Sequence, residues 1–218
     1  MKFYEQSVKI QTDKNVEGAQ APVVFFHRKT AKKGVIVISI EMTKEECLER
    51  LLNAYSHHYD IVRDVTVEGG SYPAEAIFFL RDENYLISRK HVLNAVENHE
   101  YVYFYLTDHL DAETLRQQIE VSCAAGMTNI KPDKEHMSSF VTLVILADTI
   151  DPEAKAIIKK TRFRKNFRLA LHGWMEYHIA AMEISTQSFL SNPAGKEAKK
   201  LLEMNFNPRQ TKKGRVSQ

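Results

Sequence analysis

Cysteine is scarce in this chain of 218 residues: only Cys47 and Cys123 occur, and no Cys-x-x-Cys pair is present. Zinc fingers, zinc ribbons and thioredoxin-type redox sites are therefore excluded. Two isolated thiols are typical of a reducing compartment. The first residues also lack the apolar core of a signal peptide. We therefore expect a cytoplasmic protein.

Long hydrophobic runs are missing as well. The longest apolar stretch extends from about Phe140 to Ala147 and is interrupted by Thr142, whereas a spanning helix needs roughly 20 apolar residues. We therefore expect no membrane among the partners. The chain also contains no Gly-x-Gly-x-x-Gly, P-loop, Gly-x-Ser-x-Gly or His-Glu-x-x-His motif. These absences remove the common nucleotide-dependent and hydrolytic chemistries, and we expect no cofactor.

The composition is that of an ordinary globular protein, with 44% hydrophobic, 27% charged and 10% aromatic residues. A fully disordered, collagen-like or coiled-coil chain is excluded. No Pro/Gly/Ser-rich linker interrupts the middle of the chain. We expect a single domain over residues 21–204, preceded by a segment of uncertain order (1–20) and followed by a basic, disordered tail (205–218).

Helical and strand patterns are both present, without regular βαβ alternation. Thr43 and Glu46 form a capping box that opens a helix. Further helices are expected at 89–99, at 111–125 with Gly126 as the C-terminal cap, after Asp151-Pro152, and up to about 204. Strands are expected at 23–27, 34–40, 60–68, 74–80, 85–88, 101–106, 138–146, 163–171 and 174–184. Residues 81–84 are expected to form the turn of a hairpin. This pattern predicts an α+β fold, in which a largely antiparallel or mixed sheet packs against helices.

Positive charge is concentrated near the C-terminal end. The segment Lys155–Arg168 contains seven Lys or Arg residues and no acid, and the segment Asn205–Gln218 contains four more. The net charge of the whole chain is only +2, so the rest of the chain is acidic. An acidic body with two basic segments is the main electrostatic feature of the sequence.

The basic run suggests an anion-binding strand. If the chain is extended from Arg162, then Arg162, Arg164 and Arg168 share one face and the phenylalanines the other. Guanidinium groups suit phosphate oxygens, and Trp174 is a candidate stacking surface beside them. Our leading hypothesis is a non-enzymatic module that binds nucleic acid, another polyanion or a protein partner. The alternative is a strand face that is only solvated, or one that forms salt bridges with the acidic body of the same chain.

Two other readings remain open. A metal-dependent hydrolase or nuclease could use a strand face with His172, Glu176 and His178, or the pair Glu135 and His136 that follows Pro132-Asp133. No lysine stands where the nuclease pattern needs one, and Gly173 interrupts the strand face. The third reading is a structural or regulatory interaction module, for which a homo-oligomer is a candidate assembly.

Three short strings resemble an uncharacterised bacterial domain family over about residues 46–203. The strings are 85–90, 135–139, and 163–167 continuing through Gly173-Trp174. The resemblance implies a bacterial cytosolic setting and one domain. It supplies no catalytic residue, because such a family has no established activity.

Overall fold

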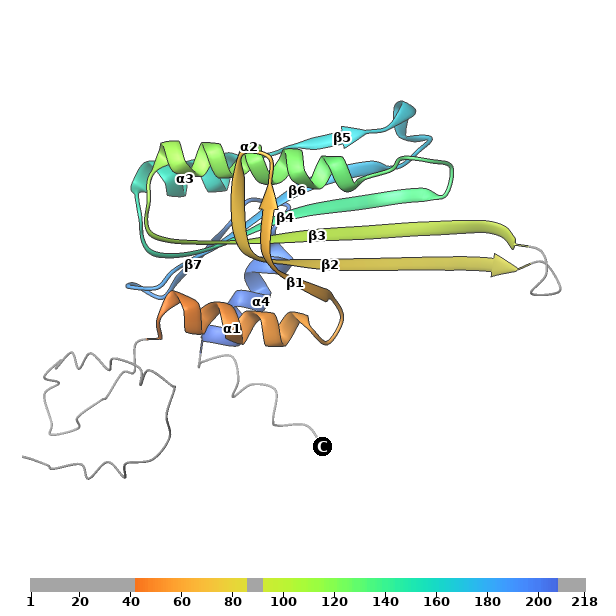
Figure 1. Cartoon of the computed structure of the whole chain (residues 1–218). Helices are drawn as coiled ribbons and strands as arrows, with labels where there is room; N and C mark the ends of the chain where they lie inside the picture. Colours follow the sequence, from red (N-terminus) through yellow and green to blue (C-terminus); the bar gives the residue numbers. More distant parts are fainter. Residues whose placement is uncertain (1–41, 86–91, 208–218) are drawn as a thin grey trace, which may run out of the picture. The chain divides into compact units, whose positions relative to one another are not determined.

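The computed structural model describes residues 42–85 and 92–207, which form one mixed seven-stranded sheet and four α-helices (Figure 1). The helices are α1 (Lys44–Tyr55), α2 (Ala112–Asn129), α3 (Pro152–Lys160) and α4 (Lys196–Phe206). The strands are β1 (Asp60–Val67), β2 (Gly70–Tyr85), β3 (Val92–Leu110), β4 (His136–Ile150), β5 (Arg164–Asn166), β6 (Trp174–Glu183) and β7 (Ser188–Ser191), with a 3-10 turn, η1 (Arg168–Ala170), between β5 and β6. The predicted α+β class is confirmed.

Some predicted elements fall outside this description. The two N-terminal strands and residues 208–218 of the predicted tail lie outside the described residues. The prediction that the tail begins at residue 205 is wrong, because α4 continues to Phe206. Within the described residues, no helix has both the length and the hydropathy needed to cross a membrane.

The sheet combines antiparallel and parallel pairing. Its strand order is β1-β2-β3-β4-β6-β5, and β7 also pairs with β6. Strands β1, β2 and β3 are antiparallel neighbours, whereas β4 is parallel to both β3 and β6. Parallel neighbours cannot be joined by a tight turn. Each parallel pair therefore needs a crossover connection. Helix α2 forms the connection between β3 and β4, and α3 forms part of the connection between β4 and β6.

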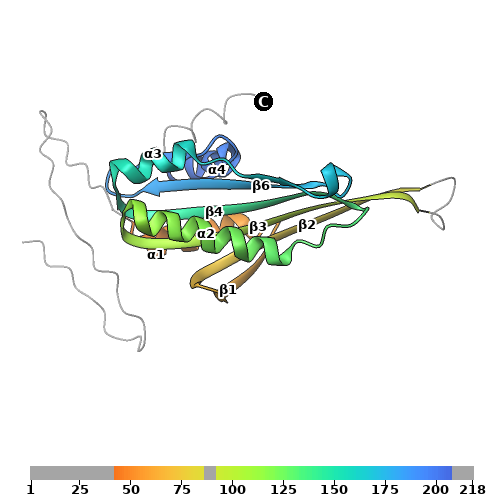
Figure 2. The same ribbon diagram turned by 90° about the horizontal axis from the view of Figure 1, so that it is seen from above.

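Each face of the sheet has its own apolar core. On one face, Leu115 of α2 and Ile158 of α3 pack with Tyr177 of the sheet. On the opposite face, Leu51 of α1 and Leu202 of α4 pack with a second set of sheet residues. Figures 1 and 2 show α2 and α3 on one side of the sheet and α1 and α4 on the other.

The predicted helix starts at Thr43 and at Asp151-Pro152 are confirmed. Thr43 Oγ1 accepts a hydrogen bond from the Glu46 backbone N–H at 3.2 Å, and the Glu46 carboxylate accepts one from the Thr43 N–H at 3.0 Å. This reciprocal pair satisfies two of the amide groups that a helix start leaves free. Asp151 is the N-cap residue of α3, with Pro152 in the first turn.

The prediction that Gly126 ends a helix is wrong, because α2 continues to Asn129. Gly126 is buried in the helix, where it faces β4. A Cβ atom at this position would lie 2.4 Å from a methyl carbon of Val141. Glycine is therefore required for the close approach of helix and sheet and not for a helix end.

The predicted helix at 89–99 is also wrong, since residues 92–110 form the long strand β3. The predicted turn at 81–84 instead continues β2 to Tyr85, and Arg81 pairs with Glu97 in antiparallel register. The spacing of Val92, Leu93 and Val96 fits one face of a helix, but β-branched valines also favour strands. The partner strand supplies the backbone hydrogen bonds that decide between these two conformations.

A polar layer lies between α2 and the sheet. Tyr101 and Tyr103 are buried there and Tyr105 is half-buried. The hydroxyl groups of Ser122 in α2 and Tyr177 in β6 lie 2.6 Å apart. The hydrogen bond between them joins the helix to the sheet through polar atoms rather than through apolar contact alone.

Glu75 of β2 is buried in the same layer with 7% of its surface exposed. Its Oε1 atom has no hydrogen-bond partner among the described residues. Burial raises the pKa of the Glu75 carboxyl group above its ordinary value, and a hydrogen bond from Tyr103 opposes this only in part. Burial therefore favours the neutral form of Glu75 more strongly in the folded state than in the unfolded chain.

This burial predicts a pH-dependent stability. Because the folded state keeps the Glu75 proton to a higher pH than the unfolded state does, the free energy of unfolding falls as pH rises from about 4 through the raised pKa. Glu75→Gln replaces the carboxyl group with an amide that does not titrate, so it removes this pH-dependent fall in the free energy of unfolding. We expect the variant to be about 1–2 kcal/mol more stable than the parent at pH 8, with a gain that shrinks toward pH 5.

Urea unfolding at pH 5, 6, 7 and 8 measures this difference. Glu120→Gln removes the same charge from an exposed position of α2 and is the matched control. A Glu75→Gln variant with the same stability change at pH 5 and pH 8 would contradict the interpretation.

Candidate anion-binding site

The segment after α3 is extended for only part of its predicted length. Strand β5 pairs antiparallel with β6, and the Phe163 carbonyl accepts a hydrogen bond from the Tyr177 N–H at 2.9 Å. The φ angles of Arg168, Leu169 and Ala170 are then positive. The prediction of a strand from 163 to 171 is therefore wrong beyond Phe167.

The length of α3 explains why the chain after it is first extended and then turns back. Helix α3 has nine residues and spans about 14 Å, whereas the ten residues of β6 span about 33 Å. The helix is too short to carry the chain back to the start of a strand parallel to β4. The remaining distance is covered by the extended segment that contains β5, and a tight reversal then leads into β6.

The predicted arginine face is only partly assembled. Arg162 follows α3, and its guanidinium donates a hydrogen bond to the Lys160 carbonyl at 3.0 Å. The guanidinium of Arg164 lies over the Trp174 ring, 4.8 Å from the ring centroid. Arg168 lies in η1, beyond the strand. The structure thus brings Arg164 and Trp174 together, and it places Arg168 outside the extended face that the sequence predicted.

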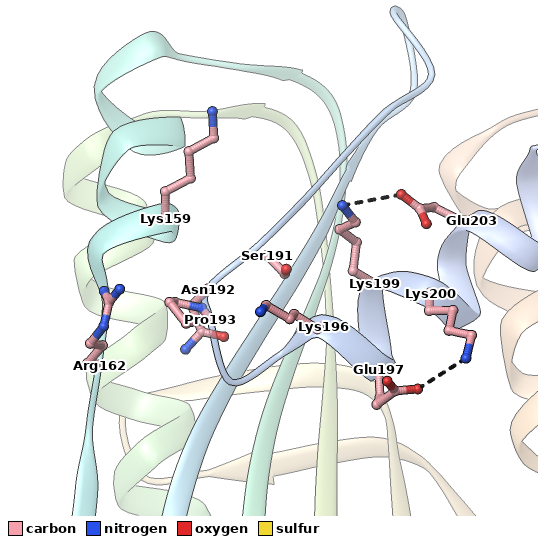
Figure 3. Close-up of a pocket in the computed structure, with 10 residues that line it drawn as sticks. All are labelled: Lys159, Arg162, Ser191, Asn192, Pro193, Lys196, Glu197, Lys199, Lys200 and Glu203. Atoms are coloured by element: carbon pink, nitrogen blue, oxygen red, sulfur yellow. Dashed lines mark ion pairs between the residues drawn. The ribbon is translucent and has the colours of Figure 1, made fainter.

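Two adjoining hollows lie beside this segment, and they share Arg162 and Pro193. The larger one has a volume of about 840 Å³ and lies between the end of α3 and the start of α4 (Figure 3). The smaller one has a volume of about 580 Å³ and continues along β5 past Phe163 and Arg164. We call the two hollows together the basic groove.

The larger hollow has an excess of positive charge. Its cations are Lys159, Arg162, Lys196, Lys199 and Lys200, and its acids are Glu197 and Glu203. Both acids are neutralised locally, since Lys199 pairs with Glu203 at 3.3 Å and Lys200 pairs with Glu197 at 3.7 Å. Figure 3 shows these two ion pairs along α4. The charges of Lys159, Arg162 and Lys196 are left over, and no ion pair to another described residue balances them.

The buried side chain of Asn192 holds the walls of the groove together. Its Oδ1 atom accepts hydrogen bonds from the N–H groups of Ile179 at 2.9 Å and Gly195 at 2.7 Å. Its Nδ2 atom donates to the carbonyls of Tyr177 at 2.9 Å and Thr161 at 3.3 Å. The side chain therefore connects β6 with the end of α3 and the start of α4, and both donors and both lone pairs are used.

Sequence reasoning missed Asn192 and Lys196 as parts of the site. By itself, the string Asn192-Pro193-Ala194-Gly195 predicts only a break in the chain. A polar amide next to proline and glycine indicates a turn, but it does not show which distant backbone groups the amide will reach.

The predicted metal-ligating face is not formed. Gly173 has a φ of 72° and separates His172 from β6. Glu176 and His178 do share a face, with 3.7 Å between the carboxylate and Nε2. Burial lowers the pKa of His178, although Glu100 and Glu176 oppose this effect. Across residues 42–85 and 92–207, no three His, Cys, Asp or Glu side chains are grouped so that they could hold a metal ion.

The pair Glu135 and His136 is used structurally. Asp133 accepts hydrogen bonds from the backbone N–H groups of both residues. The buried ring of His136 has Nδ1 at 2.7 Å from the His172 carbonyl and Nε2 at 2.8 Å from Ser139 Oγ. Because a carbonyl only accepts, Nδ1 carries the proton and Nε2 accepts from the serine. This arrangement ties the loop before β4 to the β5–β6 turn.

Comparison with known families gives one match. The model of a family described as a domain of unknown function, DUF8052, matches residues 43–204, about three quarters of the chain. This agrees with the resemblance to an uncharacterised domain family. Neither the curated proteins nor the solved structures contain a match to this chain.

The role of Asn192 predicts a large loss of stability on truncation. Asn192→Ala leaves two buried N–H groups and two carbonyls without these partners, so we expect the free energy of unfolding to fall by about 3 kcal/mol. Asn53→Ala, at an exposed position of α1, is the control and is expected to change it by less than about 0.5 kcal/mol. Equal effects of the two substitutions in urea unfolding would show that Asn192 does not hold the groove.

Proposed function

We propose that this chain, which belongs to the DUF8052 family, is a non-enzymatic module that binds a phosphate-bearing polyanion in the basic groove. The single observation that carries the proposal is the unbalanced charge of the larger hollow. Lys159 and Arg162, at and just after the end of α3, and Lys196, at the start of α4, line one hollow, while the neighbouring lysines are already paired with acids.

This arrangement suits phosphate for physical reasons. Cations that are held close together without counter-charges repel one another, and a polyanion relieves that repulsion while it releases its own bound counterions. The first turn of α4 adds to the attraction, because its N-cap residue Gly195 has no side chain to accept hydrogen bonds from the free amide groups. A phosphate oxygen can take that place.

The smaller hollow extends the proposed site along β5. Arg164 is held over Trp174, so its guanidinium is oriented before a ligand arrives. Phe163 beside it is 43% exposed and offers a ring on which a base can stack. Single-stranded nucleic acid and inorganic polyphosphate share the phosphate chemistry that the groove would recognise. The stacking contact separates them, because polyphosphate has no base.

The same proposal includes a cytoplasmic, bacterial setting. Cys47 and Cys123 are both free thiols, which suits a reducing compartment. We prefer binding to metal-dependent catalysis because the larger hollow is cationic and both of its acids are already paired with lysines. The one acid that lines the smaller hollow, Glu176, lies 3.7 Å from His178 Nε2.

Binding across a salt series tests the proposal. We expect the full chain to bind a fluorescent single-stranded oligonucleotide and, in a competition arm, inorganic polyphosphate. Lys159→Ala with Lys196→Ala should lower the affinity for both about tenfold or more and reduce the slope of log K against log salt by about 1.4. Phe163→Ala should weaken binding of the oligonucleotide only.

The matched control is Arg63→Ala with Arg116→Ala, which removes two positive charges from ion pairs with Glu49 and Glu153 away from the groove. This control should retain the affinity of the parent. Salt-independent binding, or the same loss in both double variants, would refute a specific site in the groove.

A further inference from the structure

The turn between β5 and β6 displays two leucines in solvent. Leu169 is 96% exposed and Leu171 is 78% exposed, more than any other large hydrophobic residue among the described residues. Two such side chains beside each other are unfavourable in water. Folding has not hidden them, although apolar surface is buried on both faces of the adjacent sheet.

The turn has a defined conformation that is stabilised by hydrogen bonds within it. Phe167 N–H donates to the Gly173 carbonyl at 2.9 Å, and Leu171 N–H donates to the Arg168 carbonyl at 3.1 Å. Three consecutive residues that are not glycine, including Leu169 with a φ of 55°, adopt the left-handed conformation, which is strained for residues with a Cβ atom. Strain of this kind persists only where the surroundings enforce it.

Contacts at the base of the turn hold these residues in the strained conformation. Phe167 is buried and its ring lies edge-on to the ring of His136, 5.6 Å between centroids. His136 Nδ1 donates to the His172 carbonyl at 2.7 Å. A Cβ atom at Gly173 would lie 2.3 Å from the Met137 carbonyl oxygen, so the base fits closely against the first residues of β4. The base is anchored, and only the tip with the leucines projects into solvent.

Positive charge surrounds the leucines. No acid occurs between Lys155 and Met175. Lys165 and Arg168 precede the leucines along the chain, and the Lys165 Nζ atom lies 5.7 Å from the centroid of the Phe167 ring. The loop before β4 contains two acids, Asp133 and Glu135, and the Asp133 carboxylate accepts two backbone hydrogen bonds. That loop also carries two lysines of its own. The surface around Leu169 and Leu171 is therefore apolar at its centre and cationic at its margin.

We propose that this turn docks the protein on the surface of an anionic lipid bilayer. Leu169 and Leu171 enter the boundary between headgroups and acyl chains, while Lys165 and Arg168 contact anionic headgroups. A protein partner fits less well, because a stable interface covers about 800 Å² per side and needs a matching cavity, whereas acyl chains accept a leucine without one. The expectation of no membrane partner rested on the lack of a spanning segment, and surface docking requires none.

Co-sedimentation of the full chain with vesicles tests this inference. We expect binding to vesicles of phosphatidylcholine with 30% phosphatidylserine, and much weaker binding to pure phosphatidylcholine. Leu169→Ala with Leu171→Ala should lower the partition coefficient about tenfold or more. Lys165→Ala with Arg168→Ala should lower it to a similar extent and remove most of its dependence on salt.

The controls separate docking from general effects. Val62→Ala with Met204→Ala truncates two other exposed hydrophobic residues, 45% and 47% exposed, and should bind vesicles like the parent. Because both leucines of the turn are exposed, their substitution should leave thermal unfolding unchanged. Lys159→Ala with Lys196→Ala should also retain vesicle binding, which keeps this result independent of the basic groove.

Three outcomes would overturn the inference. The first is equal binding to the two kinds of vesicle or to neither of them. The second is a leucine double variant that sediments with anionic vesicles like the parent. The third is vesicle binding that disappears with Lys159 and Lys196, which would assign the lipid contact to the basic groove and not to the turn.

Discussion

The parallel pairing of β4 with both β3 and β6 is the constraint on which the rest of the structure depends. Parallel strands need crossovers, and crossovers are almost always right-handed. Both crossovers step across the sheet in the same direction, so α2 and α3 are placed on the same face. The opposite face is left to α1 and α4, which stand outside the crossovers in sequence.

The second crossover also creates both proposed surfaces. Since α3 is too short to return the chain to the start of β6, β5 and a tight turn complete the path. The basic groove forms at one end of this segment, where α3 ends near the start of α4. The leucine turn forms at the other end. Because β6 must start parallel to β4, the connecting segment exposes cations at the basic groove and apolar side chains at the leucine turn.

Two buried polar side chains stabilise the ends of this segment. Asn192 joins the end of α3 to β6 and α4 at the groove, and His136 joins the β5–β6 turn to the loop before β4. Both groups have their hydrogen bonds satisfied by backbone atoms or a hydroxyl, which is why they are tolerated without exposure to water. The loss of either would leave backbone groups of distant segments unpaired.

Features that depend only on neighbouring residues could be predicted from the amino-acid sequence alone. These include the capping box at Thr43, the start of α3 at Asp151-Pro152, the buried strand around 138–146 and the α+β class. Tertiary structure decided whether residues 92–99 pair as strand, why Gly126 lies within a helix, and where the extended segment after Arg162 turns back. Local patterns report the preferences of a short stretch of chain, whereas these outcomes depend on hydrogen bonds, packing distances and crossover lengths between segments far apart in sequence.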